Sequence, residues 1–165
     1  RGDLGRRLVR ASTHVVGLGV RGRHALGNKC WIYYPGDECP FHRATVFSNY
    51  ADDNCPKEGA RLPTLRVAPG GDGDGGGPGG PYHSLMFEVT ESAARPVPPH
   101  AALLDACVAG AVAVGLLAPG AELVSLFHER LEHGYPVPHV DRDAVLDEAL
   151  PLLRRHGIFS RGRFG

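Results

Sequence analysis

The segment 31–50 constrains the fold most strongly, because its pattern predicts two strands joined by a turn. Residues 30–34 and 41–50 are β-prone, and the stretch between them carries turn-forming Pro, Gly and Asp. The pattern predicts an antiparallel hairpin in which Tyr33 and Arg43 lie nearly opposite one another. Whether the two side chains share a face of the sheet depends on the register, which the sequence does not fix.

Further elements are predicted along the rest of the chain. They are a basic arm or open helix over 1–12, a glycine-broken strand over 14–22, a short strand over 62–67, a strand over 82–91, a fully buried helix over 101–117, a strand over 122–131 (with a helix there as the less favoured alternative), a rigid turn over 132–139 that exposes Tyr135, and an amphipathic helix over 141–156. The order lacks the βαβ alternation of parallel sheets. The sequence therefore predicts an α+β fold, with an antiparallel or mixed sheet and covering helices.

The length of 165 residues is sufficient for one domain with a core. We expect a single partial domain over 1–165, with a flexible glycine-rich insertion at 70–80. Asp72 and Asp74 do not predict a calcium loop within this insertion, because no Glu closes the pattern. The chain begins without Met and ends in a loop-like Arg-Gly-Arg-Phe-Gly run, so we expect a fragment of a longer protein.

Residues 17–22 satisfy the pattern G-x-G-x-x-G, which is typical of dinucleotide-binding loops. Such a loop opens an amphipathic helix, and an acidic residue follows about twenty positions later. Residues 23–29 contain another Gly and show no apolar periodicity. We therefore expect a strand that runs into a loop, with the nucleotide-loop interpretation as the weaker alternative.

Composition excludes several classes of function. Lys plus Arg and Asp plus Glu both number 18, and this balance argues against nucleic acid as a partner. The most apolar segment, 101–118, contains Asp105, so we expect a buried helix there, with no membrane span and no signal peptide. The four cysteines match no zinc-site spacing, and reduced cytoplasmic thiols are favoured over disulfides. No metal site is predicted.

No catalytic residue is predicted, because the sequence contains no nucleophile elbow, no H-E-x-x-H run and no evident carboxylate pair. Anion binding is better supported. The candidate side chains are Tyr33, Arg43, Tyr135, Arg161 and Arg163. Guanidinium groups match phosphate oxygens, and a Tyr hydroxyl adds a neutral donor, so two tyrosines and two arginines would clamp a diphosphate. The alternative, with core tyrosines and solvated arginines, stays open.

Six motifs occur in a fixed order along nearly the whole chain. They are G-L-G-V-R-G (17–22), K-C-W-I-Y-Y-P (29–35), C-P-F-H-R-A-T-V-F-S-N-Y (39–50), E-V-T-E-S (88–92), H-G-Y-P-V-P (133–138) and S-R-G-R-F-G (160–165). This ordered set resembles the eukaryotic (fungal-type) UDP-galactopyranose mutases. The resemblance implies a part of an amine-oxidase-like FAD-binding fold that lacks the N-terminal dinucleotide-binding βαβ unit.

In that family, reduced FAD attacks the anomeric carbon of the sugar through flavin N5, and UDP leaves. UDP-galactopyranose becomes UDP-galactofuranose with no net redox change. The resemblance implies that Tyr33, Arg43 and Tyr135 contact the diphosphate of the UDP-sugar. It places Arg163 just before the last flavin-contacting segment and Trp31 near the sugar. It leaves open whether the full-length protein forms a homo-oligomer.

The sequence departs from the family pattern at two positions: His42 stands where Tyr is commoner, and Gly36 where an acidic residue is commoner. Neither departure removes an implied contact. The dinucleotide fingerprint and the final flavin loop are not in this chain, so we expect that it neither holds FAD nor turns over by itself. The alternatives are an FAD-dependent oxidoreductase of the amine-oxidase type and a non-catalytic, truncated UDP-sugar-binding paralogue.

Overall fold

The computed structural model describes residues 3–57, 59–72 and 79–163. Its strands are β1 (Arg10–Arg21), β2 (Trp31–Tyr33), β3 (Arg43–Val46), β4 (Arg66–Val67), β5 (Tyr82–Glu91) and β6 (Glu122–Pro136). Its helices are α1 (Leu4–Arg7), α2 (His100–Ala113) and α3 (Arg142–Arg155), with 3-10 turns η1 (Phe47–Asn49) and η2 (Asp52–Asn54). The six strands form one sheet in the order β2-β3-β5-β1-β6-β4, and every strand pair is antiparallel. The predicted α+β class is thereby confirmed.

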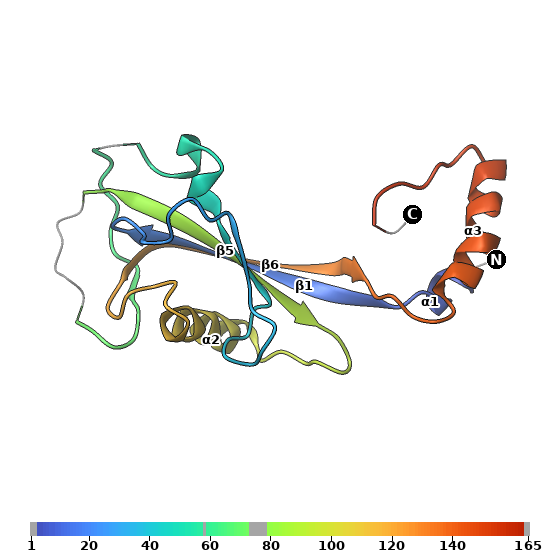
Figure 1. Cartoon of the computed structure of the whole chain (residues 1–165), viewed down its shortest axis with the longest axis horizontal. Coiled ribbons are helices and arrows are strands. Elements are labelled where there is room, and N and C mark those ends of the chain that lie inside the picture. Colours follow the sequence, from blue (N-terminus) through green and yellow to red (C-terminus); the bar gives the residue numbers. More distant parts are fainter. Residues whose placement is uncertain (1–2, 58, 73–78, 164–165) are drawn as a thin grey trace.

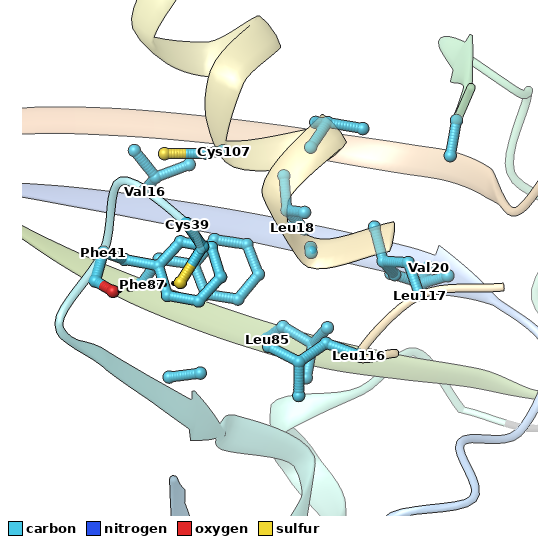
Figure 2. Close-up of a cluster of buried hydrophobic side chains, with 14 of the residues drawn as sticks. Val16, Leu18, Val20, Cys39, Phe41, Leu85, Phe87, Cys107, Leu116 and Leu117 are labelled. Carbon is cyan, nitrogen blue, oxygen red and sulfur yellow. Dashed lines mark hydrogen bonds between the residues drawn. The ribbon is translucent and has the colours of Figure 1, made fainter. Parts of the chain in front are cut away.

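Three long strands, β5, β1 and β6, form the centre of the sheet, and α2 covers one of its faces (Figure 1). Side chains alternate between the two faces of a strand. On β1, the alternate residues Val16, Leu18 and Val20 are fully buried and belong to the core beneath α2 (Figure 2). Phe41 and Phe87 stack in the same core, with ring centroids 4.3 Å apart. We call the sheet face opposite α2 the second face.

The helix α2 was predicted to be fully buried, and this prediction is wrong. Leu103, Cys107 and Val108 are fully buried against the sheet, whereas Ala102 and Asp105 are exposed. Alanine and valine are apolar on every side of the helix, so within 101–117 only Asp105 marks the side that faces solvent. The helix therefore covers the sheet as a single outer layer.

The helix α3 agrees with the predicted amphipathic helix, but it does not cover the sheet. It lies with α1 beyond the end of the β1–β6 ribbon (Figure 1). Val145 is its fully buried residue, and Arg7 Nη1 lies 3.3 Å from Glu148 Oε1. Gly157, with φ of 72°, follows the helix as the predicted C-terminal stop. The prediction of covering helices thus holds for α2 alone among the described residues.

The strand β6 extends beyond its predicted end, so the rigid turn predicted over 132–139 is wrong. Residues up to Pro136 pair with β1, and a register shift lies between Ala11 and Thr13. A Cβ atom on Gly134 would lie 2.2 Å from Thr13 Oγ1, so the close approach of the two strands at this irregularity requires glycine. Tyr135 consequently lies half-buried in a strand and is not displayed on a turn.

Other boundaries are shorter than predicted. The second hairpin strand ends at Val46 and passes into η1, and the predicted strand 62–67 is reduced to β4. The basic arm contains the one-turn helix α1. Within the predicted insertion 70–80, residues 73–78 lie outside the described part of the chain, as does Asp74 of the rejected calcium pattern.

The glycine pattern 17–22 lies in and just after β1, where no helix follows, as the preferred interpretation predicts. Gly17 and Gly19 point to the second face and lie beneath the side chains of Phe127 and Ser125 on β6. A Cβ on Gly19 would be 2.9 Å from Ser125 Cβ, and one on Gly17 would be 3.3 Å from Phe127 Cβ. These glycines make room for a neighbouring strand's side chains, so they do not form a phosphate-binding loop.

Candidate functional site

The predicted hairpin forms, and Tyr33 pairs with Arg43 across β2 and β3. The two side chains share the second face, because Ala44 and Val46 of β3 point into the core. The Arg43 Cζ atom lies 5.9 Å from the centroid of the Tyr33 ring. Tyr33 is 63% exposed, and its ring lies over the guanidinium.

Glu88 of β5 holds Arg43 in place, and the sequence did not predict this contact. Arg43 and Glu88 pair across the two strands, and Arg43 Nε donates to Glu88 Oε1 at 2.9 Å. Arg43 Nη2 contacts the same oxygen. Burial of Arg43 opposes its charge, but the hydrogen bonds with Glu88 and Tyr33 outweigh it and raise the arginine pKa. Neither bond to Glu88 uses Arg43 Nη1, so the N–H groups of this nitrogen are left for Tyr33 or an anion.

Trp31 lies on the same face, two residues from Tyr33 along β2. Its ring is 55% exposed and meets the Tyr50 ring edge-on, with centroids 6.0 Å apart. Tyr50 in turn meets Phe47 of η1 at 5.8 Å. The aromatic residues of the hairpin therefore extend from the Tyr33–Arg43 pair toward η1 as an exposed row.

Tyr135 and Arg163 form a second pair. The Arg163 Cζ atom lies 4.4 Å from the Tyr135 ring centroid, and Arg163 Nη1 donates to the Tyr135 hydroxyl. Residues 28 positions apart meet here because β6 leads into α3 and the chain then returns toward the sheet (Figure 1). Arg161 is exposed and has no hydrogen-bond or ion-pair partner among the residues that the structure describes.

The two tyrosine–arginine pairs lie apart on the sheet. Arg43 faces Glu88 of β5, and Glu88 faces Val15 of β1. Tyr135 faces Ala11, four residues earlier on β1. Three strand spacings of about 4.8 Å and four residues of about 3.3 Å separate the α carbons by roughly 20 Å. Each pair is assembled within this chain, but the chain does not bring the two pairs into contact.

A cavity of about 580 Å³ lies on the second face between these elements. Gly17 and Gly19 form part of its floor, and Phe47, Met86 and Phe127 are among its lining residues. Because Phe47 belongs to the aromatic row of the hairpin, the cavity continues the surface that carries Trp31. Sequence reasoning missed this cavity, although the alternating glycines of β1 mark the place where the sheet surface has no side chains of its own.

Metal chemistry finds no support in the described ranges. No group of three or more His, Cys, Asp or Glu side chains there could hold a metal ion. The four cysteines are free thiols, and burial raises the pKa of Cys107 to about 12, so this thiol is not a nucleophile near neutral pH. No helix among the described residues is long and apolar enough to cross a bilayer.

The fold and the site define a mixed α+β protein with an antiparallel sheet, one helix-covered face and a second face that carries two tyrosine–arginine pairs. No protein-family model matches the chain. A crystal structure of reduced UDP-galactopyranose mutase is similar to it at 40% sequence identity, with a TM-score of 0.76. The likeness covers 98% of this chain and 29% of the mutase chain, so this chain spans less than a third of that protein. The resemblance to UDP-galactopyranose mutases is confirmed for a partial chain.

Proposed function

We propose that this chain forms the substrate-side part of a UDP-galactopyranose mutase and that its second face contacts a UDP-sugar. The similarity to a UDP-galactopyranose mutase of known structure supports a UDP-sugar as the class of ligand. The observation that carries the proposal is the Tyr33–Arg43–Glu88 arrangement, in which Glu88 fixes a half-buried guanidinium and leaves its Nη1 unused in the ion pair. In the whole protein, the proposed reaction interconverts UDP-galactopyranose and UDP-galactofuranose without net redox change.

Arg43 is proposed to bind the diphosphate through its Nη1 edge. A guanidinium that is already oriented loses little side-chain entropy when it binds an anion. Glu88 contributes this orientation, although its negative charge also weakens the attraction of Arg43 for phosphate oxygens. The exposed Tyr33 hydroxyl adds a neutral donor beside the guanidinium and needs no second desolvated charge.

Tyr135 and Arg163 are proposed to contact the ligand from the other side of the face. The hydrogen bond from Arg163 fixes the Tyr135 hydroxyl, whose own proton remains available to a phosphate oxygen. Because the two pairs are separated across the sheet, they are proposed to meet the extended UDP-sugar from opposite sides. Trp31 is proposed to lie near the sugar, where its exposed ring offers an apolar surface to a hexose.

The described residues do not fit FAD as a ligand of this chain alone. The glycine pattern 17–22 lies in and just after β1, and Phe127 and Ser125 pack over its first two glycines. FAD is therefore proposed as a cofactor of the whole mutase-like protein, and no step on this chain is assigned to it. The free thiols are consistent with a reducing compartment, and the proposal assigns the protein to the cytoplasm.

Calorimetric titration of UDP into the 165-residue chain tests the binding role directly. The proposal expects saturable binding that competes with UDP-galactose and is absent with uridine, which lacks the diphosphate. Equal binding of uridine and UDP would contradict a diphosphate site. The reaction is tested on the whole flavoprotein: isomerisation of UDP-galactofuranose without stoichiometric use of an electron donor supports the mutase, and stoichiometric use supports an amine-oxidase-type oxidoreductase.

A further inference from the structure

A line of three imidazoles connects α2 to the sheet, on the face opposite the proposed binding site. His100 Nδ1 contacts His128 Nδ1, and His128 Nε2 lies 2.8 Å from His14 Nδ1. The His14 and His128 rings are nearly parallel, at 3° between their planes. The line ends on Glu91, whose Oε2 lies 3.2 Å from His14 Nε2 and accepts a 2.6 Å bond from Arg130 Nε. We call these three histidines and Glu91 the imidazole line.

The protons of the imidazole line can be assigned from its hydrogen bonds. The bond from Arg130, reinforced by His14, lowers the pKa of Glu91, so its carboxylate is ionised and accepts a proton from His14 Nε2. Neutral His14 then has a bare Nδ1, which accepts from His128 Nε2. Neutral His128 has a bare Nδ1, which accepts from His100 Nδ1. All contacts are satisfied with three neutral rings, and the exposed His100 Nε2 is left without a proton.

This assignment limits how many protons the line can take. Each of the two imidazole–imidazole contacts holds one proton, His14 Nε2 holds one, and His100 Nε2 can hold one. The line therefore accepts one added proton with every hydrogen bond intact. A second added proton has no free position. It must put two N–H groups face to face, which breaks one contact of the line.

The His100–His128 contact is the one that a second proton is expected to break. His14 and His128 lie on β1 and β6, which stay paired through their backbones, whereas His100 is the first residue of α2. A positive charge is disfavoured at a helix N-terminus, and Pro99 at the N-cap makes no side-chain capping bond. Burial, His100 and His14 lower the pKa of His128, while Glu129 opposes the shift. Arg130, which donates to Glu91, is a permanent positive charge at the other end of the line.

We propose that the imidazole line is a pH-sensitive latch, which fixes the first turn of α2 to the sheet and releases that turn when it binds its second proton. The latch is independent of the proposed ligand of the second face. Its buried part is His14, which is 6% exposed, and its exposed end is His100. Leu103 further along α2 remains anchored in the core, so the release is confined to the first turn.

Amide hydrogen exchange of the 165-residue chain tests the latch. The reporter is the Leu103 amide, which donates to the Pro99 carbonyl at 2.9 Å in the first turn of α2. After correction for intrinsic exchange, its protection is expected to fall on the order of tenfold between about pH 7.5 and about pH 5. The Leu116 amide donates to Ala111 O at 2.8 Å at the other end of the helix and serves as the internal reference. Its corrected protection should not change over the same pH range.

The variant His100→Gln separates the latch from general acid destabilisation. Glutamine can still bond to His128 but gains no proton, so Leu103 protection should lose its pH dependence. His156→Gln, at an exposed position after α3, removes a histidine outside the line and should behave as the unmodified chain does. Loss of protection in the His100→Gln variant equal to that in the unmodified chain would overturn the proposal, as would constant Leu103 protection in the unmodified chain.

Discussion

At the scale of single residues, Arg43 is the side chain on which the proposed diphosphate contact depends most. Replacing Arg43 with Ala is expected to weaken UDP binding by about 1.5–3 kcal/mol, because a charged hydrogen bond is lost. The dissociation constant from calorimetric titration of UDP measures the change. The matched control is Arg66→Ala, which removes another strand arginine that is ion-paired, in this case with Asp105.

The Arg43 prediction needs a second variant, because Arg43→Ala also leaves the buried Glu88 carboxylate without its cation. Combining the change with Glu88→Gln removes that unpaired charge, so the unfolding midpoint should recover in the double variant. UDP binding should remain weak. Recovery of both stability and binding would show that Arg43 acts only as the partner of Glu88.

Tyr33 permits a cleaner test, because its ring is largely exposed and the change Tyr33→Phe removes a single oxygen. We expect UDP binding to weaken by about 0.5–1.5 kcal/mol, the usual value of one neutral hydrogen bond. The free energy of unfolding should stay unchanged. Tyr50→Phe, on the neighbouring exposed ring, is the control and should leave the dissociation constant as it is. Equal weakening by both changes would argue against a specific Tyr33 contact.

Sequence reasoning at this scale succeeded within the hairpin and was incomplete beyond it. The turn length alone placed Tyr33 opposite Arg43, and the strand pairing confirms this position. Glu88 could not be assigned to Arg43, because the two residues are 45 positions apart and the register between β3 and β5 depends on the tertiary fold. The site roles of Trp31 and of both tyrosine–arginine pairs stay predictions until binding is measured.

At the scale of elements, the glycines of β1 explain how β6 packs against it. Gly19→Ala would place a Cβ 2.9 Å from Ser125 Cβ, so we expect a loss of about 1–3 kcal/mol in the free energy of unfolding. Denaturant unfolding monitored by circular dichroism measures it. Gly5→Ala in α1, where no atom lies within 4 Å of the added Cβ, is the control and should be neutral or slightly stabilising. Equal effects of both changes would contradict the packing argument.

Elements with a strong local signal were predictable, and elements shaped by their neighbours were not. The strand over 82–91 and the helix over 141–156 match β5 and α3 closely, since alternation and amphipathic periodicity are local properties. The extent of β6 was missed because Gly134 and Pro136 indicate a turn in isolation. Pairing with β1, including the irregularity opposite Ser12, keeps these residues in the sheet.

At the scale of the whole molecule, buried and half-buried histidines predict how stability depends on pH. Burial lowers the pKa of His42, His83 and His128, with other charged groups modifying each shift. The folded chain therefore binds fewer protons than the unfolded chain as the pH falls below the ordinary histidine value of about 6.5. The stabilisation is complete above that pH and is lost as the pH drops through the lowered values.

The measurement is the free energy of unfolding from denaturant titrations at a series of pH values between about 8 and about 5. It should decrease steadily below about pH 6.5. His83→Gln should reduce the slope, because it removes a histidine that is 6% exposed and whose Nδ1 bonds to Gly22 O. The exposed His133→Gln variant should leave the slope unchanged. A stability that rises toward acid pH would contradict the sign of the predicted effect.

The proposed position of this chain within a longer mutase-like protein gives the last prediction. The chain aligns with 29% of a mutase, and packed side chains cover the first two glycines of the dinucleotide-like pattern 17–22. We therefore expect the 165-residue chain to bind UDP but not FAD, as measured by flavin fluorescence and equilibrium dialysis in the same sample. UDP binding shows that the second face is folded, so it controls for a misfolded preparation.

Stoichiometric FAD retention would contradict the prediction and place flavin-binding residues within this chain. The expected outcome, UDP binding without FAD, would show that the second face forms its diphosphate contacts without the flavin. The UDP site and the FAD site of the proposed enzyme would then lie in different parts of its sequence.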